Sequence, residues 1–104
     1  MSVEISFDKS KQYIQVKGEL TSATVMSALK QLSRECQSLS KWVIDFTHVT
    51  KVDSTAIAML IELKRNALKK KKTISFIYLP TSLLTIARLS QLDDMLTDKA
   101  AKAP

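Results

Sequence analysis

Apolar residues in this chain recur at every second position in some segments and at every third or fourth position in others. Val3, Ile5 and Phe7 alternate with polar residues, and Ile14 and Val16 repeat the pattern after a short polar turn. Period-two alternation is typical of a strand with one buried face. Two such runs joined by a short turn predict an N-terminal hairpin.

Helical spacing follows the hairpin. The hydroxyls of Thr21, Ser22 or Thr24 are candidates to cap a helix, since such side chains accept hydrogen bonds from the N–H groups of a first turn. Apolar spacings of four and three residues then predict an amphipathic helix. This stripe consists of Val25, Leu29, Leu32, Cys36 and Leu39. Because Cys36 lies on the stripe, we expect a buried and unreactive thiol.

The centre of the chain predicts a strand, a loop and a long helix. Residues 42–46 are almost continuously apolar, which is typical of a strand covered on both faces. Polar residues at 47–52 predict a loop. A dense apolar segment then predicts a second helix, capped by Asp53 or Ser54 and running to about Lys70.

The C-terminal third repeats this order. Residues 73–79 predict a strand that Pro80 ends, and Thr81 or Ser82 is expected to cap a third helix. One more packed turn is expected at residues 92–96. The helices and strands therefore follow one another as β-β-α-β-α-β-α.

This order predicts the fold class. Strands joined by helices of this length run parallel, with right-handed crossovers, whereas the N-terminal hairpin is antiparallel. We therefore predict a single α/β domain, residues 1–96, with a four-stranded mixed sheet covered by helices. An Ala- and Lys-rich C-terminal tail at residues 97–104 is expected to be flexible.

Rare residue types exclude several kinds of site. The 104 residues include one cysteine, one histidine and one glycine. An intrachain disulfide needs two cysteines, and a Cys/His zinc site needs more ligands than this chain has. Nucleotide-binding phosphate loops need several glycines. We therefore expect no metal and no cofactor.

No targeting or membrane-spanning segment is expected. The first residues lack a basic stretch followed by an apolar run. The longest unbroken apolar run, residues 56–61, is far shorter than the roughly 20 residues that cross a bilayer. These observations predict a soluble, cytoplasmic protein.

The formal net charge is +6, and part of it is concentrated in one run of lysines at the end of the second predicted helix. The run consists of Lys69, Lys70, Lys71 and Lys72. We interpret it as a solvated helix end, because cations complement the negative end of a helix dipole. A surface for nucleic acid typically interleaves aromatic residues, whereas Phe76 and Tyr78 lie in a strand pattern. We expect no nucleic-acid partner and at most a peripheral membrane contact.

Hydroxyl and carboxylate side chains are concentrated in residues 45–56, between a predicted strand and a predicted helix. A helix N-terminus presents unpaired N–H groups and binds anions. Ser54 lies where these donors could receive a phosphate, although the charge of Asp53 opposes a second negative charge. Plain N-capping by Asp53 or Ser54 explains the same residues, and both interpretations stay open.

A catalytic set is not evident. A serine nucleophile needs a base that a third group holds in place, and His48 is the only histidine. The acidic residues Asp45, Asp53, Asp93 and Asp94 fit strand ends and a helix cap as well as they fit carboxylate pairs. We therefore predict that the protein is not an enzyme.

Three motifs have counterparts in a known family. The segment VDSTAIAML at residues 52–60 resembles the family signature, and IDF at residues 44–46 resembles the strand that leads into it. VKGEL at residues 16–20 resembles the motif that closes the second strand. On these motifs the chain resembles the STAS domain family, which includes anti-sigma-factor antagonists and the tails of sulfate transporters.

Within that family, the chain is most similar to the MlaB-like subset. The similarity rests on DSTA at residues 53–56, LPTSL at 79–83, IARL at 86–89 and LDDML at 92–96. The SQ pair at residues 90–91 departs from the Tyr-Gly that is common there. MlaB-like proteins are small cytoplasmic subunits of the ABC transporter that moves phospholipid between the inner and outer membranes of Gram-negative bacteria.

This resemblance implies a non-enzymatic subunit that binds and supports the transporter ATPase, and through it the permease, at the cytoplasmic face of the inner membrane. It places the ATPase contact at the loop and helix start of the signature, where small side chains let another backbone approach closely. Neighbouring third-helix residues would join that contact. The residues carried over from the motif are Asp53, Ser54, Thr55 and Ala56, with Lys51 beside them. Leu84 and Arg88 are our own candidates from the third helix, since a standard interface needs more area.

The alternative is an anti-sigma-factor antagonist that a partner kinase switches by phosphorylating Ser54. A phosphate adds roughly two negative charges beside Asp53, which is enough to disrupt a close-packed contact. The two hypotheses differ in the partner, which is an ATPase in the first and a kinase in the second.

Overall fold

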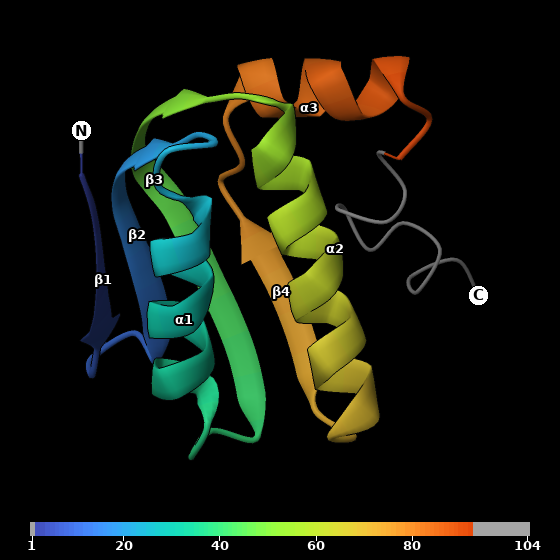
Figure 1. Ribbon diagram of the computed structural model, residues 1–104. Helices are drawn as coiled ribbons and strands as arrows, with labels where there is room; N and C mark the ends of the chain where they lie inside the picture. Colours follow the sequence, from blue (N-terminus) through green and yellow to red (C-terminus); the bar gives the residue numbers. More distant parts are fainter. Residues whose placement is uncertain (1, 93–104) are drawn as a thin grey trace.

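Four strands and three helices follow one another in the predicted order in the computed structural model, which describes residues 2–92 (Figure 1). The predicted fold class, a single α/β domain with a mixed sheet, is confirmed. The elements are β1 (Val3–Asp8), β2 (Tyr13–Leu20), α1 (Val25–Cys36), β3 (Lys41–Val52), α2 (Ser54–Lys69), β4 (Thr73–Ile77) and α3 (Thr81–Leu89).

The sheet has the strand order β1-β2-β3-β4. The hairpin β1-β2 is antiparallel, while β2 with β3 and β3 with β4 are parallel. Helices α1 and α2 make the two crossovers and lie over the same face of the sheet (Figure 1). The chain therefore enters both helices at one end of the molecule and leaves them at the other, which gives the protein two distinct ends.

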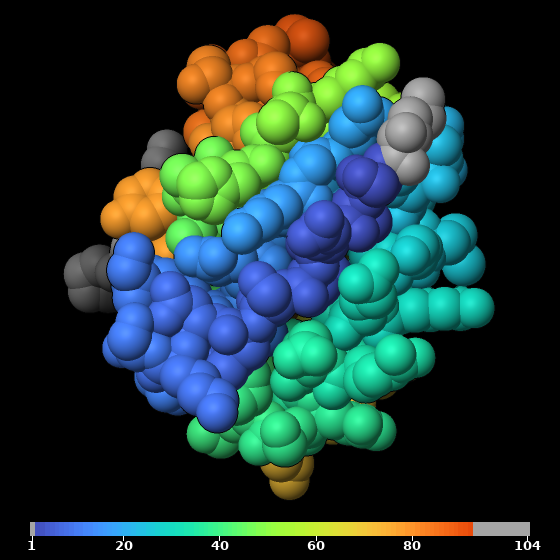
Figure 2. All heavy atoms as spheres, turned by 90° about the vertical axis from the view of Figure 1, so that its left-hand side faces the viewer, coloured from blue at the N-terminus to red at the C-terminus, as the bar shows by residue number. Residues whose placement is uncertain are grey.

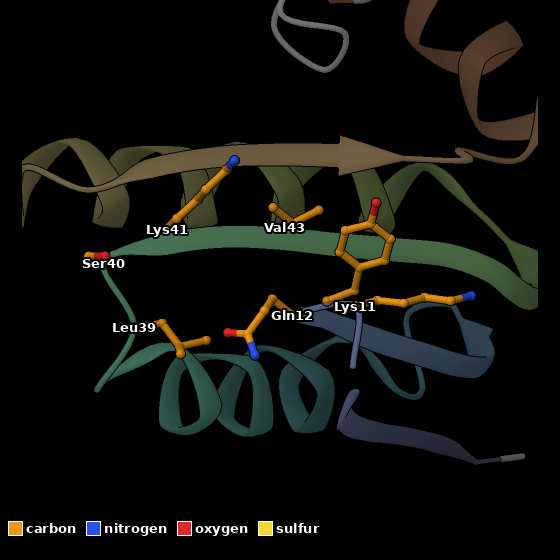
Figure 3. A pocket seen from close by; sticks show the side chains of 7 residues that line it. Lys11, Gln12, Leu39, Ser40, Lys41 and Val43 are labelled. Carbon is orange, nitrogen blue, oxygen red and sulfur yellow. The ribbon is translucent and has the colours of Figure 1, made fainter. Parts of the chain in front are cut away.

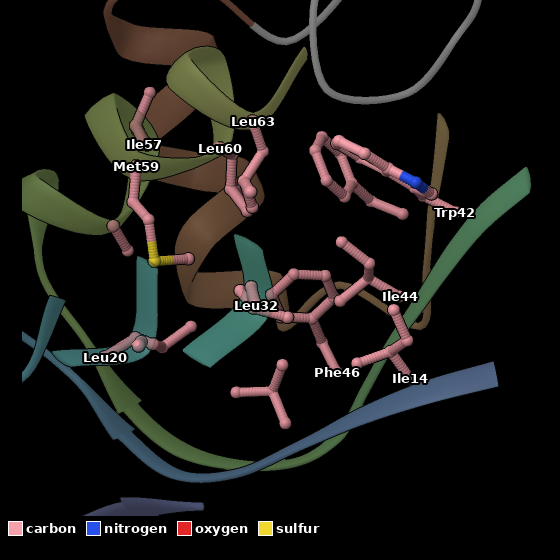
Figure 4. Close-up of a cluster of buried hydrophobic side chains, with 14 of the residues drawn as sticks. Ile14, Leu20, Leu32, Trp42, Ile44, Phe46, Ile57, Met59, Leu60 and Leu63 are labelled. Atoms are coloured by element: carbon pink, nitrogen blue, oxygen red, sulfur yellow. The ribbon is translucent and has the colours of Figure 1, made fainter. Parts of the chain in front are cut away.

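The core lies between this sheet face and the two long helices. All of residues 42–46 are buried, as the apolar run predicts. Trp42 donates its indole N–H to the Leu39 carbonyl at 3.2 Å, and Phe46 packs edge-to-face on Phe76 at 5.8 Å. Figure 4 shows Trp42 and Phe46 on the side of the sheet that faces Leu60 and Leu63 of α2. The largest fully buried side chains are Trp42, Phe46, Ile14, Leu20, Leu32, Ile44, Leu60, Leu63, Leu83, Val16 and Cys36.

Gly18 allows β1 to pass close to the end of β2. Its φ is +103°, and a Cβ at this position would lie 2.4 Å from the backbone oxygen of Ser2. That same oxygen accepts the N–H of Glu19 at 3.1 Å. The glycine of the VKGEL motif is therefore required by backbone geometry, since an L side chain would be strained and would clash.

The loop predicted at residues 47–52 is wrong, because β3 continues to Val52. The paired positions include His48 with Lys17 and Val52 with Leu20. The polar side chains of this stretch are mostly exposed, although its backbone is hydrogen-bonded into the sheet. Polar side chains show that a segment is exposed to solvent, but they do not show whether its backbone is paired in a sheet. The polar composition of residues 47–52 therefore suggested a loop where the structure has an exposed strand.

The predicted ends of α1 also need correction. The helix ends at Cys36, so Leu39 packs against the core from the following loop. Thr24 is the N-cap residue, yet its side chain makes no capping bond. Its hydroxyl instead donates to the Glu19 carbonyl at 2.7 Å and accepts the Thr21 N–H at 3.0 Å. The hydroxyls here therefore stabilise the link between β2 and α1.

Two boundaries differ after β4. The strand ends at Ile77, so Tyr78 and Leu79 are outside it, and Pro80 is the N-cap residue of α3. The turn predicted at residues 92–96 and the tail predicted at 97–104 lie outside the described residues, apart from Leu92. Its N–H donates to the Ala87 carbonyl at 2.7 Å, which closes the end of α3.

Candidate partner-binding site

Asp53 connects the start of α2 to the link between β2 and α1. Its Oδ1 accepts the backbone N–H of Thr55 at 2.9 Å and also the Thr55 hydroxyl. Its Oδ2 accepts the backbone N–H of Ser22 at 3.0 Å, from the link between β2 and α1. These hydrogen bonds, the one from the Thr55 hydroxyl first, lower the pKa of Asp53. Of the two candidate caps, Asp53 is therefore the one that caps α2.

Ser54 is the reachable hydroxyl of the Asp-Ser-Thr sequence. It is the first residue of α2 and is exposed. No side-chain hydrogen bond of Ser54 occurs within residues 2–92, whereas Asp53 and Thr55 are bonded to each other. A partner can therefore approach the Ser54 side chain without breaking a bond inside the domain.

One of the expected partner contacts, Ala56, is buried in the folded chain. It is 0% exposed and belongs to the hydrophobic core, so the expectation that it contacts a partner is wrong for the folded chain. Two residues correspond to about 200° of rotation in an α-helix, so Ala56 lies on the side of α2 opposite Ser54, and that side faces the core. Lys51, by contrast, is exposed near the end of β3, two residues before the helix cap Asp53.

Helix α3 packs against α2 and crosses the end of the molecule at which α2 begins (Figure 1). Within α3, Leu84 is half-buried and Arg88 is exposed. The structure therefore brings the third-helix candidates to the same end of the molecule as Ser54 and Lys51. We call this end the Ser54 end.

An apolar groove between α1 and α2 extends from the Ser54 end, and the sequence patterns did not predict it. It has a volume of about 210 Å³. Met26, on its rim, is 68% exposed. Its flexible thioether side chain is of the kind that adapts to partner surfaces. The groove is lined by Val25, Met26, Leu29, Thr55, Ala58, Met59 and Glu62.

Tyr78 is a second residue that sequence reasoning did not select. It is 69% exposed and has a φ of +57°, between β4 and α3. A non-glycine residue with positive φ stores backbone strain, and such residues concentrate at functional sites. Its position in an apolar run suggested an ordinary strand residue, whereas the structure shows an exposed side chain on a backbone with positive φ, a conformation that Gln12, Lys71 and Gln91 also adopt.

Within residues 2–92, no histidine or acidic side chain forms a hydrogen bond with the Ser54 side chain. His48 lies within β3 and is exposed, and the Asp45 carboxylate accepts the N–H and hydroxyl of Thr47. Across the described residues, no three His, Cys, Asp or Glu side chains gather closely enough to hold a metal ion. None of the helices in the described part combines the length and hydrophobicity needed to cross a bilayer.

Comparison with known families identifies the family to which the chain belongs. The family model described as "Mlab, STAS domain" matches residues 3–97. The chain belongs to the MlaB-type STAS domain family. No curated protein matches the sequence. The resemblance carried by the VDSTAIAML and VKGEL motifs is thereby confirmed.

Solved STAS domain structures share the fold. The phosphorylated form of SpoIIAA, a Bacillus cell fate determinant, has a TM-score of 0.64 at 12% identity, with 95% of each chain covered. The unphosphorylated form of the anti-sigma factor antagonist SpoIIAA has a TM-score of 0.61 at 10% identity, covering 84% of this chain and 82% of that one. At such low identity these structures establish the STAS fold and not a shared partner.

Proposed function

We propose that this STAS domain is a non-enzymatic subunit that binds and supports the ATPase of an ABC transporter for phospholipid, which maintains outer-membrane lipid asymmetry. It would act at the cytoplasmic face of the inner membrane and reach the permease through the ATPase. The MlaB-type family match supports this proposal. The observation that carries it is the exposed Ser54 between two side chains that are bonded to each other, beside an apolar groove.

The contacts around Ser54 suit protein docking. Asp53 bonds the start of α2 to the Ser22 backbone, so the surface is held in place before a partner arrives. Preorganisation of this kind reduces the entropy lost on binding. An apolar groove supplies the buried centre that tight interfaces have, and Lys51 and Arg88 supply a polar rim.

Neighbouring surface would complete the interface. A stable complex buries about 1,600 Å² in total, more than one helix end provides. Leu84 and Arg88 of α3, the rim residue Met26, and Tyr78 are the exposed or half-buried side chains that we expect to add area. Ala56 packs in the core beneath this surface and supports it without contacting the partner.

Two substitutions at one position test the docking surface. Ser54→Ala is expected to bind the ATPase as wild type does, because a small residue suffices there. Ser54→Asp is expected to weaken binding at least tenfold, because it places a second carboxylate beside Asp53 in a contact that excludes water. Affinity is measured by calorimetry with the purified transporter ATPase. Equal affinity of wild type, Ser54→Asp and Ser54→Trp would remove the Ser54 end from the interface.

The identity of the partner needs a separate experiment. The tagged protein is purified from native membranes, and co-purifying proteins are identified by mass spectrometry. An ABC ATPase and its permease are the expected partners. Recovery of an anti-sigma factor with kinase activity instead would contradict the proposal.

A phospho-switch is the second candidate function. The exposed Ser54 hydroxyl at the start of α2 favours it, as does the fold shared with SpoIIAA, whose phosphorylated form has been solved. In this case Ser54 of the native protein carries a phosphate under some growth conditions, and intact-mass measurement detects it. A neighbouring sigma factor gene and kinase gene would also favour this candidate over the transporter subunit.

A further inference from the structure

The end of the molecule opposite Ser54 is strongly basic. It consists of the β1-β2 turn, the last turn of α1, the start of β3 and the end of α2, which lie toward one end in Figures 1 and 2. Its acidic residues are Asp8 and Glu35, and the Asp8 carboxylate already accepts hydrogen bonds from Ser10 and Lys11. Its basic residues are Lys9, Lys11, Arg34, Lys41, Lys69, Lys70, Lys71 and Lys72. We call this surface the basic end.

A cavity of about 350 Å³ opens at the basic end, between the β1-β2 turn and the start of β3. Figure 3 shows Lys41 extending from the start of β3 and Lys11 extending from the β1-β2 turn, with their ammonium ends pointing in different directions. Tyr13, Gln12 and Ser40 add neutral polar groups, and none of the described residues that line the cavity is acidic. The rim of the cavity therefore carries two cations and neutral polar groups, which favours a phosphate-bearing group at this end over a cationic one.

The lysine run lies on the other side of the same segment. Lys72 donates to the Gln37 carbonyl at 2.9 Å, and the ammonium groups of Lys70 and Lys72 lie 6.0 and 5.7 Å from the centre of the Trp42 ring. Lys69 and Lys71 are exposed beside them. Cations therefore flank the start of β3 on both faces of the sheet.

Leu68 distinguishes this surface from an ordinary solvated helix end. It is 76% exposed in the last turn of α2, directly before the lysine run. An apolar side chain among cations is the combination that peripheral proteins present to anionic membranes, where the cations meet headgroups and the apolar group enters the interface.

We propose that the basic end is a docking surface for an anionic lipid membrane, and that the lysine-lined cavity receives a lipid phosphate. Nucleic acid fits less well, because single strands need exposed aromatic rings for stacking. Trp42 is 1% exposed beneath Lys70 and Lys72. Among the described residues, the exposed aromatic side chain is Tyr78, which follows the far end of β4, and Tyr13 in the cavity is half-buried.

Vesicle sedimentation tests this proposal with the full chain. Wild-type protein is expected to bind vesicles of phosphatidylglycerol and phosphatidylcholine in equal parts and to dissociate from them at high salt. It is not expected to bind vesicles of phosphatidylcholine alone. A lysine near an anionic surface strengthens partition about fivefold. The double variants Lys69→Gln/Lys71→Gln and Lys11→Gln/Lys41→Gln are therefore each expected to bind roughly 25-fold more weakly.

A matched control removes the same charge elsewhere. Lys17 of β2 and Lys30 of α1 are exposed and lie outside the basic end. Lys17→Gln/Lys30→Gln is expected to bind within about twofold of wild type, and thermal unfolding verifies that every variant is folded. A control that loses as much binding as the lysine-run variant would overturn the proposal, since net charge alone would explain the result.

Two competitors identify the source of the phosphate. Inorganic phosphate at millimolar concentration and a short DNA duplex are each added to protein bound to vesicles. Persistent vesicle binding supports a membrane partner, whereas complete release by inorganic phosphate or by DNA at equal phosphate concentration overturns it. The inference does not rely on the proposed ATPase, because Lys69→Gln/Lys71→Gln leaves the Ser54 end unchanged and is expected to bind the ATPase normally.

Discussion

At the scale of single residues, three neighbours in the Asp-Ser-Thr sequence have different roles. Asp53 and Thr55 bond to each other and hold the helix start, while Ser54 between them stays exposed. The motif therefore combines an internal support with a surface group. The residues alone left open whether Asp53 or Ser54 caps the helix and whether Ser54 could receive a phosphate. The structure assigns the cap to Asp53 and leaves Ser54 exposed.

Asp53→Ala is expected to lower the free energy of unfolding by about 1–2 kcal/mol, because the N–H groups of Thr55 and Ser22 lose their acceptor. The measurement is urea denaturation near neutral pH. Ser54→Ala serves as the control, since Ser54 makes no capping bond within the described residues and its unfolding free energy is expected to stay within about 0.5 kcal/mol of wild type.

The same site predicts a pH dependence. Because the folded pKa of Asp53 is lowered from 3.8, the ionised carboxylate stabilises the fold above that value. This contribution is lost as pH falls through the lowered folded pKa. The stability difference between wild type and Asp53→Asn is therefore expected to shrink on acidification. A difference that stays constant from neutral pH to below 3.8 contradicts this assignment.

At the scale of elements, the end of α2 shows how a helix ends without glycine. The Lys72 N–H reaches back to the Ala67 carbonyl at 2.8 Å, and the Lys71 N–H reaches the Leu68 carbonyl at 3.1 Å. Lys71 has a φ of +57° in this turn. This is the helix-ending pattern in which glycine normally occupies the left-handed position, because an L side chain is strained there.

Lys71→Gly is expected to raise the free energy of unfolding by about 0.5–1 kcal/mol, since relief of left-handed strain exceeds the added entropy of the unfolded chain. Lys71→Ala removes the same charge but keeps a Cβ, so it separates charge from backbone conformation. Chemical denaturation of both variants provides the measurement. An equal gain for alanine and glycine would show that lysine repulsion, and not backbone strain, is relieved.

At the scale of the whole molecule, the packing of α1 on the sheet buries Cys36, the only cysteine in the sequence. Cys36 is 0% exposed, and burial raises the pKa of its thiol to about 12. The neutral thiol is favoured in the folded state, so its contribution to stability is present below the ordinary pKa of 9.0 and declines as pH rises toward about 12.

Modification of Cys36 by a soluble disulfide reagent is therefore expected to require opening of the core. In native buffer at mildly alkaline pH, labelling is expected to be slow, whereas denaturant makes it complete within the mixing time. Absorbance of the released thiolate follows the reaction. Rapid stoichiometric labelling of the native protein would mean that α1 does not protect this position.

The chain by itself determined the number, order and type of the elements, because the spacing of apolar residues decides which local structure can bury one face. It also placed Ser54 at a helix start. Pairing with β2 made residues 47–52 a strand, and that pairing depends on a segment distant in sequence.

Only the tertiary structure decided which of the candidate residues a partner can reach. Ala56 and Ser54 are two positions apart in the chain, yet one is enclosed by the core and the other is exposed. The groove beside Met26 and the cavity between Lys11 and Lys41 each need two segments to meet. Exposure and concavity are properties of packed neighbours, and periodicity along one segment carries no information about them.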